Sequence, residues 1–135
     1  MSADVFLTRA RAMKDELVAV RRNIHRHPEL AFQELRTAEK GRDWLQGLGL
    51  EIQDGIAGTY GLVATLDTGR SGPTLLIRAD MDALPIAEET GTQCVSETPG
   101  VMHACGHDAH LDEDALLLGT AALGRVAMDY VQRGG

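Results

Sequence analysis

Residues 99–110 read Pro99-Gly100-Val101-Met102-His103-Ala104-Cys105-Gly106-His107-Asp108-Ala109-His110. The stretch offers thiol, imidazole and carboxylate groups, the side chains that bind divalent metals, within a short length of chain. Cys105 and His107 are two positions apart, which puts them on one side of an extended chain but not on one face of a helix. Gly106 between them adds no side chain and permits unusual backbone torsions. We therefore expect a metal-binding loop with Cys105 and His107 as ligands, followed by a helix that Asp108 caps.

Two further histidines in this stretch, His103 and His110, have two interpretations. Each could bind the metal, or each could pack as a structural histidine, which is the commoner role of a single histidine. The residues alone leave the choice open.

A pair of aspartates follows the apolar run at residues 74–77. The run has no polar alternation, which predicts a strand covered on both faces. Asp80 and Asp82 come just after it, and ligands bind at the carboxyl ends of strands in α/β sheets. We predict that both carboxylates lie at the mouth of the site, within about 10 Å of Cys105, the range over which charges interact at ~0.1 M salt. In the alternative, one aspartate only caps a turn before Pro85.

The remaining elements are predicted from periodicity. Apolar residues at steps of three and four predict a helix over residues 6–24 that stops near His27, because Pro28 follows. A second helix is predicted over residues 37–48, with Ala38, Leu45 and Leu48 inward and Gly49 as its stop. Further strands are predicted at residues 50–53 and 62–66. This order of elements predicts the α/β class, with helices packed on a sheet.

Two other polar features receive structural interpretations. The segment from His25 to Glu29 is expected to terminate a helix and pack at the surface. Cys94 is expected to have a structural role or none, because a free cysteine usually behaves as a small apolar residue.

Composition excludes several classes of function. A net charge of -7 and an aromatic content of 4% argue against binding to a phosphate backbone or to stacked bases. No apolar run approaches the ~20 residues that span a bilayer. We expect no signal peptide, because residues 1–4 lack a basic and an apolar region, and with two cysteines no disulfide framework. These features together predict a cytoplasmic protein that binds neither nucleic acid nor membrane.

Three segments resemble a known family. They are residues 21–30, Arg-Arg-Asn-Ile-His-Arg-His-Pro-Glu-Leu; residues 78–86, Arg-Ala-Asp-Met-Asp-Ala-Leu-Pro-Ile; and residues 100–110, quoted above. In this order and spacing they resemble the metal-dependent amidohydrolases of the aminoacylase and carboxypeptidase G clan. Within the clan they are similar to the hippurate hydrolases and the hydrolases of indole-acetyl amino acid conjugates. The resemblance covers about residues 5–110, and its third motif is highly specific.

The resemblance implies a function and a set of ligands. It implies hydrolysis of an N-acyl amino acid or a similar amide by a three-layer α/β/α catalytic domain of the zinc-exopeptidase type, with two divalent ions of manganese, zinc, nickel or cobalt. It makes Cys105 and His107 metal ligands and gives Asp82 the place of the aspartate that supports the metal site. The general base would be a glutamate of a Glu-Glu pair further along, and homo-oligomers are possible.

The sequence departs from the family pattern after His110. Residues 111–135 contain no histidine and a single glutamate, Glu113, and they resemble the family's last helix. We therefore expect one partial catalytic domain over residues 1–135, joined near residues 110 and 111, without a dimerisation domain. The alternatives are a non-catalytic remnant that binds one metal weakly, or a mononuclear hydrolase that uses Cys105, His107 and either His110 or Asp80. Two expected ligands favour the remnant, because a catalytic zinc usually has three protein ligands.

Overall fold

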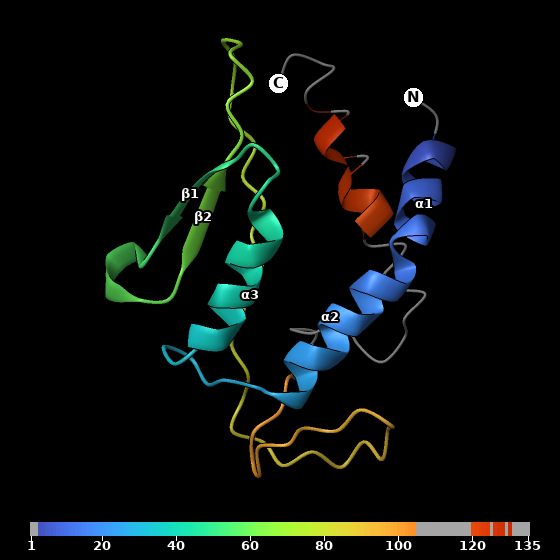
Figure 1. The fold of residues 1–135 in the computed structure, drawn as a ribbon, viewed down its shortest axis with the longest axis vertical. Helices are drawn as coiled ribbons and strands as arrows, with labels where there is room; N and C mark the ends of the chain where they lie inside the picture. Colours follow the sequence, from blue (N-terminus) through green and yellow to red (C-terminus); the bar gives the residue numbers. More distant parts are fainter. Residues whose placement is uncertain (1–2, 105–119, 125, 129, 131–135) are drawn as a thin grey trace.

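The computed structural model describes residues 3–104, 120–124, 126–128 and 130 (Figure 1). Its elements are helices α1 (Ala3–Ala12), α2 (Lys14–Arg26) and α3 (Leu35–Leu45), strands β1 (Glu51–Asp54) and β2 (Leu62–Thr65), and the short 3-10 helix η1 (Ile56–Gly58). Residues 120–124 and 126–128 are helical and lie beside α1 (Figure 1), where a Cβ at Gly124 would be 3.0 Å from Cδ1 of Phe6. The α/β class predicted from the sequence is confirmed.

The first predicted helix is divided in two at Met13. The Met13 N–H is shared between the carbonyls of Arg9, at 3.2 Å, and Ala10, at 3.1 Å, so the turn tightens there. Charges suit two separate helix ends at this point: α1 has basic residues in its last turn, and α2 has acidic residues in its first. The predicted stop is confirmed, because α2 ends at Arg26 and the His27 N–H bonds to the Ile24 carbonyl.

The second predicted helix is shorter than expected. α3 starts at Leu35 and ends at Leu45, and Ala38 is buried as predicted. Leu48 is 62% exposed, so its predicted inward position is wrong. The reason is the early stop: Gly47 already has a φ of 82°, which carries the chain out of the helix before Leu48.

The sheet has two strands in the described residues. β1 and β2 are antiparallel, with Glu51 opposite Thr65 and Asp54 opposite Leu62, so the strands predicted at residues 50–53 and 62–66 are confirmed to within a residue. α3 packs against β2, where a Cβ at Gly41 would be 3.1 Å from Cδ1 of Leu62 (Figure 1).

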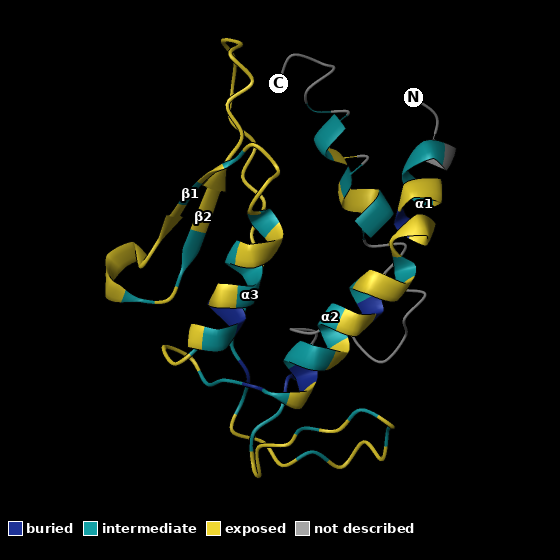
Figure 2. Cartoon of the chain, in the orientation of Figure 1, coloured by how far each residue is buried: buried dark blue, intermediate teal, exposed yellow. Residues whose placement is uncertain are grey.

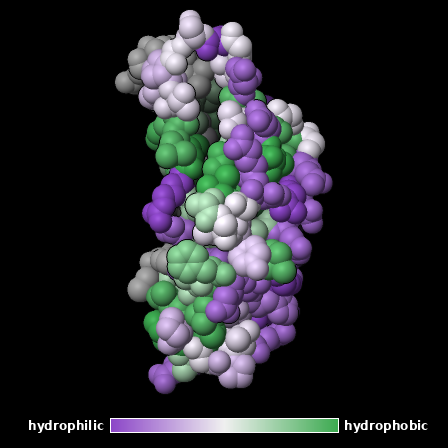
Figure 3. Space-filling model, turned by 90° about the vertical axis from the view of Figure 1, so that its left-hand side faces the viewer, coloured by the Kyte–Doolittle hydropathy of each residue, from purple (hydrophilic) through white to green (hydrophobic). Residues whose placement is uncertain are grey.

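The strand predicted at residues 74–77 does not form. These residues carry no strand assignment, and Leu76 is 83% exposed. A strand with two apolar faces needs a partner strand and a cover on each face, and the two described strands pair only with each other. The apolar run therefore lies at the surface, in the largely exposed loop beyond β2 (Figure 2). Figure 3 shows hydrophobic side chains at several places on the face that it presents.

The buried residues are small or polar. Among the described residues, the buried hydrophobic set is Ala10, Val18, Ala38 and Ala83, and the buried polar set is His25, Thr37 and His103. Most of them lie near the lower ends of α2 and α3 (Figure 2). Packing at this end of the molecule therefore depends on hydrogen bonds as well as on apolar contact. Within the described ranges, no helix is long and apolar enough to cross a membrane.

Candidate metal site

Backbone pairing fixes the segment that carries the aspartates. Ala83 pairs in parallel with Leu30, and Leu84 pairs antiparallel with Met102. The Leu84 N–H donates to the Met102 carbonyl at 2.9 Å, and the Met102 N–H donates to the Leu84 carbonyl at 3.0 Å. Asp82 stands two residues before Leu84 in the chain, and Cys105 stands three residues after Met102. This bridge therefore ties the segment of the half-buried Asp82 to the segment that precedes Cys105 in the sequence.

The two predicted ligands, Cys105 and His107, and the alternative ligand His110 lie outside the described residues. Asp80 is an exposed residue whose Oδ1 is 2.5 Å from Nη2 of Arg78. Within the described part of the chain, no group of three or more His, Cys, Asp or Glu side chains is placed to hold a metal ion. The roles of Cys105, His107 and Asp82 therefore stay predictions, and the backbone pairing supports the one for Asp82.

Two histidines lie in the core beside this segment. His103 is 3% exposed and His25 is 2% exposed, and their ring centroids are 6.5 Å apart with an interplanar angle of 37°. The expected surface position of His25 is therefore wrong, because the loop that carries Glu88 covers it. Nε2 of His25 is 3.0 Å from Oε1 of Glu88.

Glu88 is a functional candidate that the sequence analysis missed. Its side chain is only 6% exposed, and its carboxylate also accepts hydrogen bonds from the Thr90 hydroxyl and the Ser96 N–H, each at 2.5 Å. Burial by itself would raise the pKa of Glu88, but the hydrogen bonds from Thr90, Ser96 and His25 outweigh it and hold this pKa below the usual 4.5. In the sequence, Glu88 and Glu89 look like two equivalent solvated carboxylates, so no signal distinguished them.

Glu29, at the end of the segment from His25 to Glu29, has a structural role, through a cap that the sequence did not show. Glu34, at the N-terminus of α3, makes no capping bond with its side chain. Glu29, which precedes the helix in the sequence, caps it instead. Its carboxylate accepts hydrogen bonds from the Arg36 N–H at 3.0 Å, the Thr37 N–H at 2.7 Å and the Thr37 hydroxyl at 2.8 Å. These bonds satisfy helix N–H groups that would otherwise have no partner.

We expect Glu29→Ala to lower the free energy of unfolding by about 1–2 kcal/mol, the upper part of the range for removing a helix N-cap. Urea unfolding followed by far-UV circular dichroism measures the loss. Glu39→Ala, at an exposed position of the same helix, is the matched control and should change stability by less than about 0.5 kcal/mol. Equal effects of the two substitutions would contradict the capping role.

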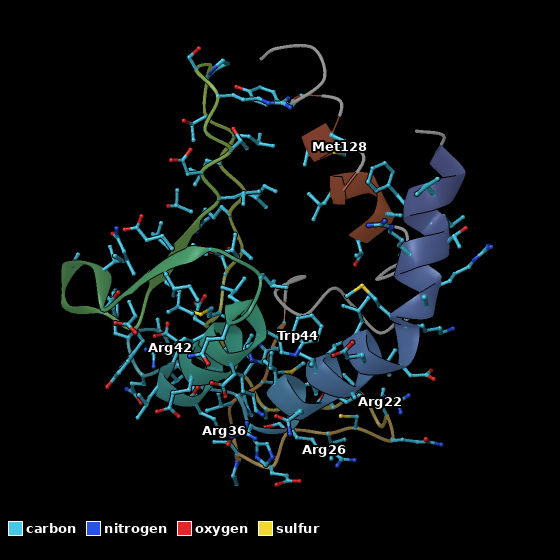
Figure 4. All side chains as sticks on the ribbon, turned by 45° about the horizontal axis from the view of Figure 1, so that its top comes forward. Arg22, Arg26, Arg36, Arg42, Trp44 and Met128 are labelled. Atoms are coloured by element: carbon cyan, nitrogen blue, oxygen red, sulfur yellow. The ribbon has the colours of Figure 1, made fainter. Side chains whose placement is uncertain are left out.

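A cleft of about 750 Å³ lies between α2 and α3. Trp44 projects from α3 toward α2 in Figure 4, and both helices contribute apolar side chains to the lining. Asp80, Met81 and His103 also line it, so the cleft adjoins the segment that leads to the metal loop.

Cys94 belongs to the loop that attaches to α2. Its Sγ donates to the Arg22 carbonyl at 3.2 Å, which agrees with the structural role expected for it. A second hydrogen bond joins this loop to α2: the Glu97 N–H donates to the Arg26 carbonyl at 2.8 Å.

Comparison with known proteins agrees with the motifs. Residues 76–128 match the model of Peptidase family M20/M25/M40. The chain is 44% identical over 113 residues to the N-acetylcysteine deacetylase of Bacillus subtilis, a match that covers 84% of this chain and 29% of that protein. It is 46% identical over 112 residues to the N-acyl-L-amino acid amidohydrolase of Geobacillus stearothermophilus, covering 82% of this chain and 29% of the relative.

A solved structure shares the fold. The crystal structure of the Bacillus subtilis YXEP protein, described as a dinuclear metal-binding peptidase of the M20 family, superposes with a TM-score of 0.68 at 41% identity. The match covers 92% of this chain and 32% of that one, so this chain spans less than a third of the relatives described. The predicted resemblance is confirmed: the chain is similar to amidohydrolases and peptidases of the M20 family and shares an α/β fold with part of one of their solved structures.

Proposed function

We propose that this chain supplies the first part of the metal site of a metal-dependent amidohydrolase that acts on N-acyl amino acids. The observation that supports the proposal is the pairing of Leu84 with Met102, because Asp82 and Cys105 stand two and three residues from the paired positions in the sequence. With the predicted ligands Cys105 and His107, Asp82 would complete a donor set of thiol, imidazole and carboxylate, which suits a divalent transition metal.

Each of these residues has a role in the proposal. Cys105 binds as a thiolate, whose negative charge offsets part of the metal charge, and His107 binds as a neutral imidazole. Asp82 supports the site, the role that the family resemblance implies for it. When bound, divalent metals supply polarisation of the amide carbonyl and a water of lowered pKa. Two ions of manganese, zinc, nickel or cobalt are proposed for the complete site.

The substrate class is proposed from the relatives. The names of the two curated relatives describe removal of an acyl group from the nitrogen of an amino acid. An N-acyl amino acid offers an amide carbonyl for the metals and a carboxylate for recognition. A cytoplasmic location and homo-oligomeric assembly are part of the same proposal.

The second candidate is a non-catalytic metal-binding remnant. The count of expected ligands favours it: the sequence offers two, Cys105 and His107, where a catalytic zinc usually has three protein ligands. We propose a single partial catalytic domain over residues 1–135, with its join near residues 110 and 111. The join lies outside the described residues, and the family match at residues 76–128 crosses it.

Metal titration tests the shared part of both candidates. We expect the chain to bind Co²⁺ or Zn²⁺, and the double variant Cys105→Ser, His107→Ala to bind at least about 100-fold more weakly, because both strong ligands are lost. Equilibrium dialysis with metal analysis gives the dissociation constants. Cys94→Ser, which removes a thiol outside the predicted metal loop, is the control and should bind the metal as wild type does. Equal metal content in wild type and the double variant would refute the site.

A further inference from the structure

We propose that Glu88 is a positioning residue for the metal site: through Ser96 and His25, its carboxylate fixes residues 100–104, which lead into Cys105. The inference rests on the proposed function, because it assumes that Cys105 and His107 bind a metal. It adds a residue that stands 17 positions before the first ligand in the sequence and shows no ligand pattern of its own.

The Glu88 carboxylate is almost fully enclosed by partners. Oε1 lies 3.0 Å from Nε2 of His25 and accepts from the Thr90 hydroxyl at 2.5 Å, and Oε2 accepts from the Ser96 N–H at 2.5 Å. Because the side chain is only 6% exposed, water cannot readily replace these partners if the carboxylate is removed. The groups that it holds would then move to find others.

The first route to the metal loop runs through Ser96. While its N–H is held by Glu88, the Ser96 hydroxyl donates to the Val101 carbonyl at 2.6 Å. Val101 precedes Met102, which is paired with Leu84. Glu88 therefore helps to set the position of the segment that pairs with Leu84.

The second route runs through His25. The His25 ring is held by Glu88 on one side and faces the His103 ring on the other, at a centroid distance of 6.5 Å. Both rings are buried, and close packing at this distance couples the position of His103 to that of His25. His103 is two residues before Cys105. Both routes thus converge on the backbone that presents the first ligand.

Glu88 is not needed to attach the loop that contains Cys94 and Glu97 to helix α2. The Glu97 N–H donates to the Arg26 carbonyl at 2.8 Å, and Cys94 donates to the Arg22 carbonyl at 3.2 Å. These two contacts attach the loop to α2 without Glu88. Loss of the carboxylate should therefore leave the fold in place and disturb the segment that approaches the metal.

The experiment compares Co²⁺ affinity in the full-length chain and its variants, followed by the thiolate absorption of bound Co²⁺. Groups that orient a metal ligand from outside the coordination sphere typically contribute 10–100-fold to metal affinity, and we expect Glu88→Ala to lose that factor. Glu88→Gln should restore most of it, because its oxygen can face Ser96 while its NH₂ faces His25 and Thr90. Glu89→Ala, at the exposed neighbour, is the control and should bind as wild type does.

The outcomes separate positioning from general stability. Wild-type affinity in Glu88→Ala overturns the proposal, and so does equal weakening in Glu88→Ala and Glu88→Gln. Far-UV circular dichroism checks the fold. If Glu88→Ala does not fold, Ser96→Ala replaces it: weaker binding supports the proposal, and unchanged binding overturns it.

A wild-type chain that binds no metal refutes the proposed function, and hydrogen exchange then decides this inference separately. Exchange at the Met102 amide, which bonds to the Leu84 carbonyl at 3.0 Å, should be faster in Glu88→Ala than in Glu89→Ala. Equal exchange rates overturn the positioning role.

Discussion

We expect the 135-residue chain to hydrolyse N-acetyl and N-benzoyl amino acids no faster than a metal-free control. Amide hydrolysis at a metal site needs a group that moves a proton, and loss of such a group typically costs 10²–10⁴ in rate. Glu113 is the only glutamate after Cys105 in this sequence, and residues 111–135 contain no histidine to complete the site. With only Cys105 and His107 as expected ligands, weak metal binding should lower the rate further.

The measurement is release of free amino acid by a preparation of verified intact mass, with and without added Co²⁺ or Zn²⁺. The Cys105→Ser, His107→Ala variant is the matched control for metal-dependent hydrolysis by contaminants. Hydrolysis that a chelator abolishes and that the double variant lacks would contradict this expectation. It would then favour a mononuclear hydrolase with His110 or Asp80 as third ligand.

We also expect the chain to self-associate through the exposed apolar run at residues 74–77. Leu75 is 37% exposed, Leu76 is 83% exposed and Ile77 is 56% exposed, and a contiguous exposed apolar segment favours association with another chain. Leu76→Lys should weaken association about tenfold, since burial of one leucine contributes roughly 1.5–3 kcal/mol.

Sedimentation velocity over a range of concentrations measures the association. Leu48→Lys is the matched control, because Leu48 is a leucine exposed to 62% in a turn rather than in an extended run. A monomer at every concentration in wild type would disprove the expectation, as would equal effects of the two substitutions.

The elements that depend on local pattern were predictable. Strand β2 (Leu62–Thr65) follows from the turn residues on either side of it, and the end of α2 before Pro28 follows from the geometry of proline. Both signals act within a few residues. The division at Met13 was not predicted, because the apolar stripe continues through it and only the charges at the two helix ends mark it. At residues 74–77 the sequence predicted an element that does not form. The apolar pattern is that of a buried strand, but burial depends on neighbouring strands that the two-stranded sheet of the described residues does not provide.

The candidate site also has a part that the sequence predicts and a part that only the structure shows. Residue types and their spacing predict the candidate metal-site residues, which are Asp80, Asp82, Cys105 and His107. The capping by Glu29 and the burial of Glu88 left no such pattern. Both depend on contacts between residues far apart in sequence, as between Glu88 and His25. Their roles follow only from where the fold places them.

The most direct test of the account is X-ray absorption at the metal edge of the chain loaded with one equivalent of Co²⁺. The account predicts a mixed coordination shell: one sulfur at about 2.3 Å, one imidazole nitrogen at about 2.0–2.1 Å, distances taken from zinc sites, and carboxylate or water oxygen. The sulfur should disappear in Cys105→Ser and persist in Cys94→Ser. A shell of oxygen and nitrogen alone in the wild-type chain, or a sulfur that survives Cys105→Ser, would contradict it.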